Sequence, residues 1–115
     1  MSTRIRTRSP IARRLKEARL RAGLSQKALG ILAGFDQFVA SARMNQYERG
    51  VHEPSFATLA LVARQLNVPT CYFFADDDAL AELVWGYSVS TASQKKQLLQ
   101  LTRKAISAQV ADSAD

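Results

Sequence analysis

Apolar residues recur every three or four positions along most of the chain, and this period predicts α-helices. The first helix is predicted to begin at Ser9-Pro10, with serine as its cap and proline in its first turn. It ends at Gly23, a residue type that suits the left-handed conformation following many helices. Its apolar stripe consists of Ile11, Leu15, Ala18 and Ala22. The basic residues expected mainly around the remaining surface are Arg13, Arg14, Lys16 and Arg21.

Two short helices follow in the predicted order. Ser25 can cap the first by accepting a backbone N–H, and Gly34 ends it. Its inward residues are expected to be Ala28, Leu29 and Leu32. In the second, which ends at Gly50, the inward residues at helical spacing are Ala40, Met44 and Tyr47. Residues 35–41 form either a long turn, which we favour, or an extension of the second helix back to a cap at Asp36.

A fourth amphipathic helix and a short fifth one complete the pattern up to residue 75. The fourth begins after Pro54-Ser55, and its apolar face is Leu59, Val62, Ala63 and Leu66. The fifth follows Val68-Pro69, and the aromatic residues that we expect to close the core there are Tyr72, Phe73 and Phe74. Cys71 beside them is interpreted as a small core residue.

Beyond residue 75 the pattern predicts two more helices. Asp76-Asp77-Asp78 suits the N-terminus of the first, because acidic groups there interact favourably with the helix dipole. Its stripe is Leu80, Leu83, Val84 and Tyr87. Gly86 and the Ser/Thr-rich residues 88–93 separate it from a last helix over about residues 94–110, and residues 111–115 are expected to fray. The stripe of this last helix is Leu98, Leu101, Ala105 and Ala108.

The most specific pattern lies in the second and third helices. Gly23 is followed by Leu24-Ser25-Gln26-x-x-Leu29, a turn and Glu48-Arg49-Gly50. In this order, residues 11–74 resemble the Cro-type helix-turn-helix domain of bacterial and phage repressors, the XRE family. The chain between Gly34 and the Glu-x-Gly end is about four residues longer than usual in that family, a change that loops tolerate.

The resemblance implies an all-α fold, in which a five-helix lambda-repressor-like helix-turn-helix domain precedes two C-terminal helices. We expect a mobile basic arm over residues 1–8, the DNA-binding domain over residues 9–75 and a C-terminal helical extension over residues 76–115. The resemblance also implies an ion pair between Arg19 and Glu48, which would tie the first helix to the end of the third.

The third helix is the predicted probe of the DNA major groove. Arginine can make two hydrogen bonds to guanine, asparagine and glutamine can do so with adenine, and alanine can contact a thymine methyl group. The candidate base contacts on its outward face are Ser41, Ala42, Arg43, Asn45, Gln46 and Arg49. At the start of the second helix, the resemblance implies that Gln26 contacts phosphate, and the adjacent Lys27 is a further candidate DNA contact.

Charge is distributed in a way that agrees with this assignment. Residues 1–30 hold nine Lys or Arg against Glu17 alone, whereas residues 31–75 balance and residues 76–115 sum to −2. Basic charge therefore lies beside the predicted probe, where phosphates would be. In the predicted arm, Arg4, Arg6 and Arg8 either wrap the duplex or attract phosphate without specificity.

Other classes of protein find little support. The chain has no apolar run near the roughly 20 residues of a membrane-spanning helix and no signal-peptide pattern. A single cysteine allows no internal disulfide, so we expect a cytoplasmic protein. Lone His52 and the acidic run at residues 76–78 form no recognisable metal or catalytic set, so we expect no metal, no cofactor and no enzymatic activity.

The sequence thus predicts a DNA-binding transcriptional regulator that acts as a homodimer on an inverted-repeat operator. Repression by occupying promoter DNA is favoured, and activation by contact with polymerase is equally compatible with the residues. Two probe helices would lie about 34–36 Å apart, one turn of DNA. The candidate dimerisation residues are Leu80, Leu83, Val84, Trp85, Leu98 and Leu101. These side chains either pair between copies or fold back on their own domain. Two other functions remain open, namely an antitoxin whose C-terminal helices bind a toxin and a protein-interaction adaptor that does not bind DNA.

Overall fold

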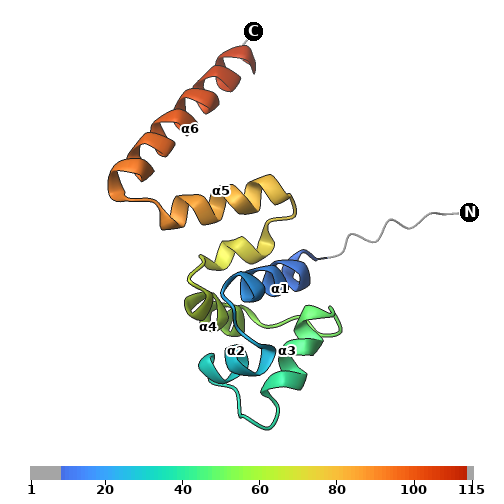
Figure 1. The fold of residues 1–115 in the computed structure, drawn as a ribbon. Coiled ribbons are helices and arrows are strands. Elements are labelled where there is room, and N and C mark those ends of the chain that lie inside the picture. Colours follow the sequence, from blue (N-terminus) through green and yellow to red (C-terminus); the bar gives the residue numbers. More distant parts are fainter. Residues whose placement is uncertain (1–8, 114–115) are drawn as a thin grey trace, which may run out of the picture.

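The computed structural model describes residues 9–113, which form six α-helices and one 3₁₀ helix without any strand (Figure 1). The elements are α1 (Ile11–Arg21), α2 (Gln26–Leu32), α3 (Ala40–Glu48), α4 (Phe56–Leu66), η1 (Thr70–Phe74), α5 (Asp78–Val89) and α6 (Ala92–Ser113). The prediction of an all-α fold is confirmed. The predicted arm with Arg4, Arg6 and Arg8 lies outside the described residues.

The first four helices and η1 pack around one core. Helix α1 packs against α3 and η1, while α2 packs against α3 and α4 (Figure 1). The apolar side chains at the centre of the core are wholly or almost wholly buried, and they are Leu15, Leu29, Met44, Leu59, Val62 and Phe73. The predicted inward faces of α3 and α4 are therefore the buried ones.

Several residues at the ends of elements were assigned to the core wrongly. Ala22 is exposed, and Leu32 and Phe74, each the last residue of its element, are 51% exposed. The last turn of each element passes the edge of the core, so helical period alone overstates burial there. The fifth element is a 3₁₀ helix, which turns more tightly than an α-helix. In it Tyr72 and Phe73 are buried, but Cys71 is exposed and is not a core residue.

The connection between α2 and α3 is a long turn, as favoured from the sequence. Gly34 adopts a left-handed φ of +96°, and α3 begins only at Ala40. Asp36 organises the turn, since its carbonyl accepts the N–H groups of Val39 (3.1 Å) and Ala40 (2.9 Å). Asp36 therefore starts the turn instead of capping an extended helix.

Close approach of α2 to α3 requires a glycine. Gly30 is buried, and a Cβ atom on it would lie 2.8 Å from the Cβ of Ala40 and 3.1 Å from its carbonyl oxygen. Real Cβ atoms do not approach other atoms so closely, so any larger residue would push α3 away from α2. The glycine costs helix propensity but sets the distance between the two helices.

Arg14 of α1 is the largest departure from the predicted burial pattern. It was expected on the surface, yet it is 1% exposed. Its Nε donates to the carbonyl oxygen of Ala75 (2.8 Å), and its two terminal nitrogens donate to Glu17 (3.0 Å) and Asp78 (2.9 Å). These acceptors satisfy the guanidinium where η1 and α5 cover it, so a charged side chain can be buried there.

Helix α5 lies on the helical body, whereas α6 extends away from it (Figure 1). The side chain of Asp77 caps α5 by accepting the N–H of Leu80 (2.9 Å). The helix continues through Gly86 to Val89, so the predicted break at this glycine is wrong. It is held at one side by Arg21, whose guanidinium carbon lies 3.7 Å from the centroid of the Trp85 ring.

A reciprocal pair of hydrogen bonds starts α6 two residues earlier than predicted. Thr91 donates its N–H to Gln94 Oε1 (2.9 Å), and Gln94 donates its N–H to Thr91 Oγ1 (3.2 Å), which is a capping box. The helix runs to Ser113, so residues 111–113 are helical and not frayed. Among residues 9–113 it contacts α5, but none of its own residues is buried, and most of its apolar side chains are exposed.

Replacing Gly30 by alanine tests the helix contact. Alanine favours a helix by about 1 kcal/mol over glycine, but overpacking against both the Cβ and the backbone of Ala40 costs about 2–3 kcal/mol. We expect Gly30→Ala to lower the free energy of unfolding by about 1–2 kcal/mol in urea denaturation. Gly86→Ala is the matched control, because that helical glycine has no atom within 4 Å of an added Cβ. An unchanged or raised stability of Gly30→Ala would contradict the packing argument.

Candidate nucleic-acid interface

Helix α3 presents a continuous polar surface opposite its buried face. Ala40, Met44 and Tyr47 are buried. The candidate base contacts that are exposed are Ser41, Ala42, Arg43, Gln46 and Arg49, and Asn45 is half-buried. The structure thus brings all six to one helix and its C-terminal cap. Together they offer hydrogen-bond donors, acceptors and one methyl group, the chemistry that base edges require.

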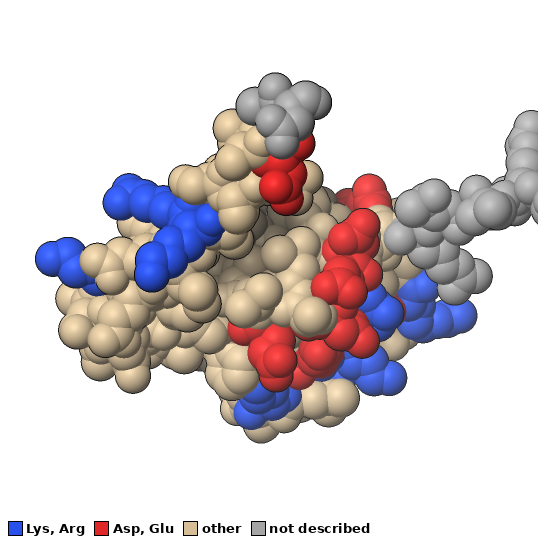
Figure 2. Space-filling view, turned by 90° about the horizontal axis from the view of Figure 1, so that it is seen from above, with Lys and Arg blue, Asp and Glu red and all other residues tan. Residues whose placement is uncertain are grey.

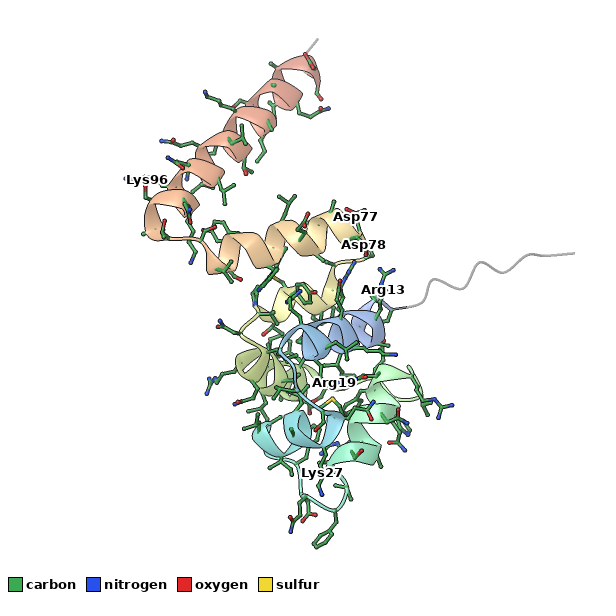
Figure 3. All side chains as sticks on the ribbon, viewed as in Figure 1. Arg13, Arg19, Lys27, Asp77, Asp78 and Lys96 are labelled. Atoms are coloured by element: carbon green, nitrogen blue, oxygen red, sulfur yellow. The ribbon has the colours of Figure 1, made fainter. Side chains whose placement is uncertain are left out.

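An ion pair between α1 and the end of α3 fixes the direction of this surface. Arg19 Nε lies 2.6 Å from Glu48 Oε2, and a second guanidinium nitrogen lies 2.9 Å from Oε1. The third guanidinium nitrogen donates to the carbonyl oxygen of Leu24 (2.9 Å), at the turn before α2. The pair links three elements, and Figure 3 shows Arg19 at the centre of the helical body.

The Arg19–Glu48 pair is buried, and burial restricts its geometry. Arg19 and Glu48 side chains are only 10% and 3% exposed. Hydrogen bonding to Glu48 raises the pKa of Arg19 above its ordinary value. Two parallel N–H···O bonds also restrict the orientation of both groups, so the pair sets an angle as well as a distance. This role belongs to the scaffold of the interface.

Gln26 connects the start of α2 to α3. Its side-chain amide donates to Asn45 Oδ1 (3.3 Å) and to Glu48 Oε1 (3.2 Å). Sequence reasoning assigned Gln26 to phosphate and missed these contacts, which depend on two residues about one turn apart on α3. This hydrogen bond orients the Asn45 amide: its Oδ1 faces Gln26, so its NH₂ group points away from Gln26.

Arg43 is held by an aromatic pair that the sequence did not reveal. Its Nε donates to the hydroxyl oxygen of Tyr47 (2.9 Å), and its guanidinium carbon lies 4.2 Å from the centroid of the Phe35 ring. Phe35 packs edge-on against Tyr47, with centroids 6.3 Å apart. Stacking on an aromatic ring keeps a guanidinium in place without saturating its hydrogen-bond donors. Arg43 therefore retains donors for a further ligand.

The two ends of the molecule differ in charge. Lys27 is exposed near the start of α2, and Figure 3 shows it toward the end of the molecule that also holds the α2–α3 connection. The opposite end, viewed in Figure 2, carries a group of acidic side chains with Lys and Arg side chains directly beside them, and Arg13 and Arg14 pair there with Asp78 (3.7 and 2.9 Å). Residues 76–89 contain Asp76, Asp77, Asp78 and Glu82 and no Lys or Arg. These acidic residues make the start of α5 unfavourable for an anionic ligand.

Other candidate chemistry is sparse in the described part of the chain. His52 and Arg49 lie in an open groove of about 960 Å³ between the start of α1 and the segment that follows α3. Residues 9–113 contain no group of three or more His, Cys, Asp or Glu residues arranged to hold a metal ion. No helix in this range is both long enough and apolar enough to cross a bilayer.

The six candidate dimerisation residues divide into two groups. Val84 and Trp85 are partly buried against the core of their own chain. Leu98 is half-buried, whereas Leu80, Leu83 and Leu101 are 45%, 64% and 67% exposed. One side of α5 therefore folds back on the helical body, and its other side faces outward together with α6.

Comparison with known proteins assigns this arrangement to a class. The sequence model of a family described as helix-turn-helix matches residues 15–73. The crystal structure of the transcriptional regulator BswR is similar over 85% of this chain and 97% of that chain, with 48% sequence identity and a TM-score of 0.80. No curated protein sequence matches. The chain belongs to the XRE-type helix-turn-helix family of DNA-binding transcriptional regulators.

The similarity extends past the family segment. Coverage of 85% exceeds the part of the chain between Ser9 and Phe74, so it includes part of the C-terminal helices. The C-terminal extension is therefore shared, at least in part, with the BswR structure.

Removing one partner of the ion pair tests its role as a brace. Arg19→Met leaves Glu48 buried without its cation, and we expect the free energy of unfolding to fall by about 3 kcal/mol. The double variant Arg19→Met, Glu48→Leu should lose clearly less, because no charge is left behind. Lys16→Met, an exposed position on the same helix, should change stability by less than about 0.5 kcal/mol. Equal losses in the single and double variants would argue against a buried pair.

Proposed function

We propose that the protein is a sequence-specific repressor that inserts α3 into the major groove of an operator. The observation that carries this proposal is the polar face of α3, with the exposed Arg43 and Gln46 and the half-buried Asn45, held at a fixed angle by the Arg19–Glu48 pair. A helix fits the width of the major groove, and these side chains match the edges of guanine and adenine. Occupying promoter DNA would exclude polymerase, and such a regulator acts in the cytoplasm.

Each candidate contact has a distinct task in this proposal. Arg43 makes the bidentate contact to guanine, after its Nε exchanges the Tyr47 hydroxyl for a base. Asn45 offers the NH₂ group that Gln26 leaves free, and Gln46 is an exposed neighbour with the same chemistry. Ser41 and Ala42 make shorter-range contacts at the start of α3, while Gln26, Lys27 and Arg49 contact phosphate or flanking bases.

Two copies would join through the outward side of α5 and through α6. The 22-residue helix α6 has no buried residue, and its exposed apolar side chains include Leu99, Leu101, Ile106 and Val110. These side chains lie on two sides of α6, with Leu99, Ile106 and Val110 on one and Leu101 on the other. A helix in water is stabilised mainly by packing of its apolar side chains, so this helix requires a partner. A symmetric dimer supplies one and places two probe helices on an inverted repeat. In this proposal residues 9–75 bind DNA and residues 76–115 form the dimer.

Selection of bound fragments from genomic DNA tests the DNA-binding proposal. We expect the parent protein to enrich an inverted repeat at both of two salt concentrations, with affinity falling steeply as salt rises. Arg43→Ala should lose about 1–3 kcal/mol of discrimination at one base pair of each half-site. Arg64→Ala, on α4, is the control with the same charge change. Salt-sensitive binding without any motif would leave only non-specific attraction, and no binding would favour the adaptor alternative.

A charge placed on α6 tests the dimer. Burying one carboxylate per chain is costly, so we expect Leu101→Glu to raise the dimer Kd by about 100-fold or more. Sedimentation velocity measures this, and binding to a two-half-site operator should weaken in parallel. Ser107→Glu adds the same charge on the polar side of α6 and should leave both unchanged. A parent protein that sediments as a monomer would indicate another partner, including the toxin of the antitoxin alternative.

A further inference from the structure

The long turn between α2 and α3 carries the most exposed large apolar side chain of the described residues. Phe38 is 86% exposed, against 69% for Phe56, the next of this type. An exposed phenyl ring contributes nothing to the core of the chain. Its position therefore calls for an explanation outside the packing of the helical body.

The backbone that presents Phe38 is fixed at both ends. Phe35 is buried, and its N–H donates to the carbonyl oxygen of Gly30 (2.9 Å). The N–H of Phe38 donates to Asp36 Oδ1 (2.8 Å), and Ala40, which follows, is fully buried. The ring thus extends from an organised turn, so little conformational entropy is lost when it meets a surface.

The turn lies next to the candidate interface. Phe38 precedes the first residue of α3 by two positions, and the exposed Ser41 and Ala42 follow directly. Figure 1 shows the connection between α2 and α3 reaching beyond both helices at one end of the molecule. A probe helix contacts base edges mainly with its N-terminal residues, so the turn would enter the major groove with them.

The turn offers no cationic side chain for a phosphate contact. Residues 31–42 contain no Lys or Arg, so this segment contributes no attraction to the DNA backbone. A phenyl ring cannot accept or donate the hydrogen bonds of a base edge. The apolar group that the major groove does offer is the C5 methyl of thymine, with which phenylalanine makes favourable contact. Apolar wedges between base steps belong to proteins that bind from the minor groove.

We propose that Phe38 is a specificity-determining residue that packs its ring against a thymine methyl group in each half-site. The contact lies beyond the base pairs reached by Ser41 and Ala42 and lengthens the half-site at its edge. This inference rests on the proposed function of α3. It differs from that function in assigning specificity to the turn and in using apolar contact where α3 uses hydrogen bonds.

Replacing thymine by uracil isolates the proposed contact, because uracil lacks only the methyl group. Binding is measured with the full-length protein and the selected operator, with each thymine replaced singly. Removing one buried methyl should weaken binding of the parent protein by about fourfold at one position of each half-site. Phe38→Ala removes the contact in both half-sites of the dimeric complex, so it should bind the thymine operator about 16-fold more weakly, about fourfold for each half-site. It should show no difference between thymine and uracil at that position. A thymine contacted by Ala42 would keep its uracil effect in this variant.

Phe74→Ala provides the control, since it removes a half-exposed phenyl ring from η1, which packs on α1, α4 and α5. It should bind both operators like the parent protein. The proposal would be overturned if Phe38→Ala kept the thymine preference of the parent protein, that is, if it lost equal affinity for the thymine and uracil operators. It would also be overturned if Phe38→Ala bound the thymine operator as tightly as the parent protein. An operator that is bound but shows no uracil effect would remove only this inference, whereas a parent protein without a preferred sequence would remove the proposed function with it.

Discussion

The ion pair between Arg19 and Glu48 is the interaction on which the geometry of the interface depends. Its two short hydrogen bonds connect α1 to the end of α3, and the remaining donor of Arg19 reaches the turn before α2. A buried pair of this kind adds little net stability, because desolvating the two charges offsets their attraction. It fixes the orientation of α3 relative to α1, since the guanidinium and carboxylate planes must align. Gln26 shares Glu48 as an acceptor and extends the same constraint to Asn45.

The contacts of the unbound interface also prepare its side chains for a ligand. Arg43 stacks on Phe35 and donates to Tyr47, so it is held near one conformation before DNA arrives. Holding a long side chain in place reduces the entropy lost on binding. In the proposed complex, exchange of the Tyr47 hydroxyl for a base edge would replace one hydrogen bond by two. Phe35 and Tyr47 thus belong to the core and also hold Arg43 on the candidate interface.

Sequence reasoning succeeded where the helical period spans a whole element and failed at its ends. The inward faces of α3 and α4 were predicted because three or more apolar positions repeat across each helix. Leu32 and Phe74 were misassigned because they occupy the last position of their elements. Burial of Arg14 depends on Ala75 and Asp78, more than sixty positions away, and no local pattern reports such acceptors. The start of α6 could have been predicted from the sequence, since Thr91 and Gln94 have the spacing of a capping box.

Arg14 has a mechanical consequence for the whole molecule. It fastens the start of α5 to α1, the same helix whose Arg19 holds α3, and only residues 75–77 separate η1 from α5. No flexible linker therefore intervenes between the probe helix and the first of the two outward helices. If two copies join through these helices, they form a rigid dimer in which the distance and the angle between the two probe helices are fixed. One base pair inserted between the half-sites rotates one half-site relative to the other by about 34–36° around the duplex axis. A rigid dimer cannot then contact both half-sites at once.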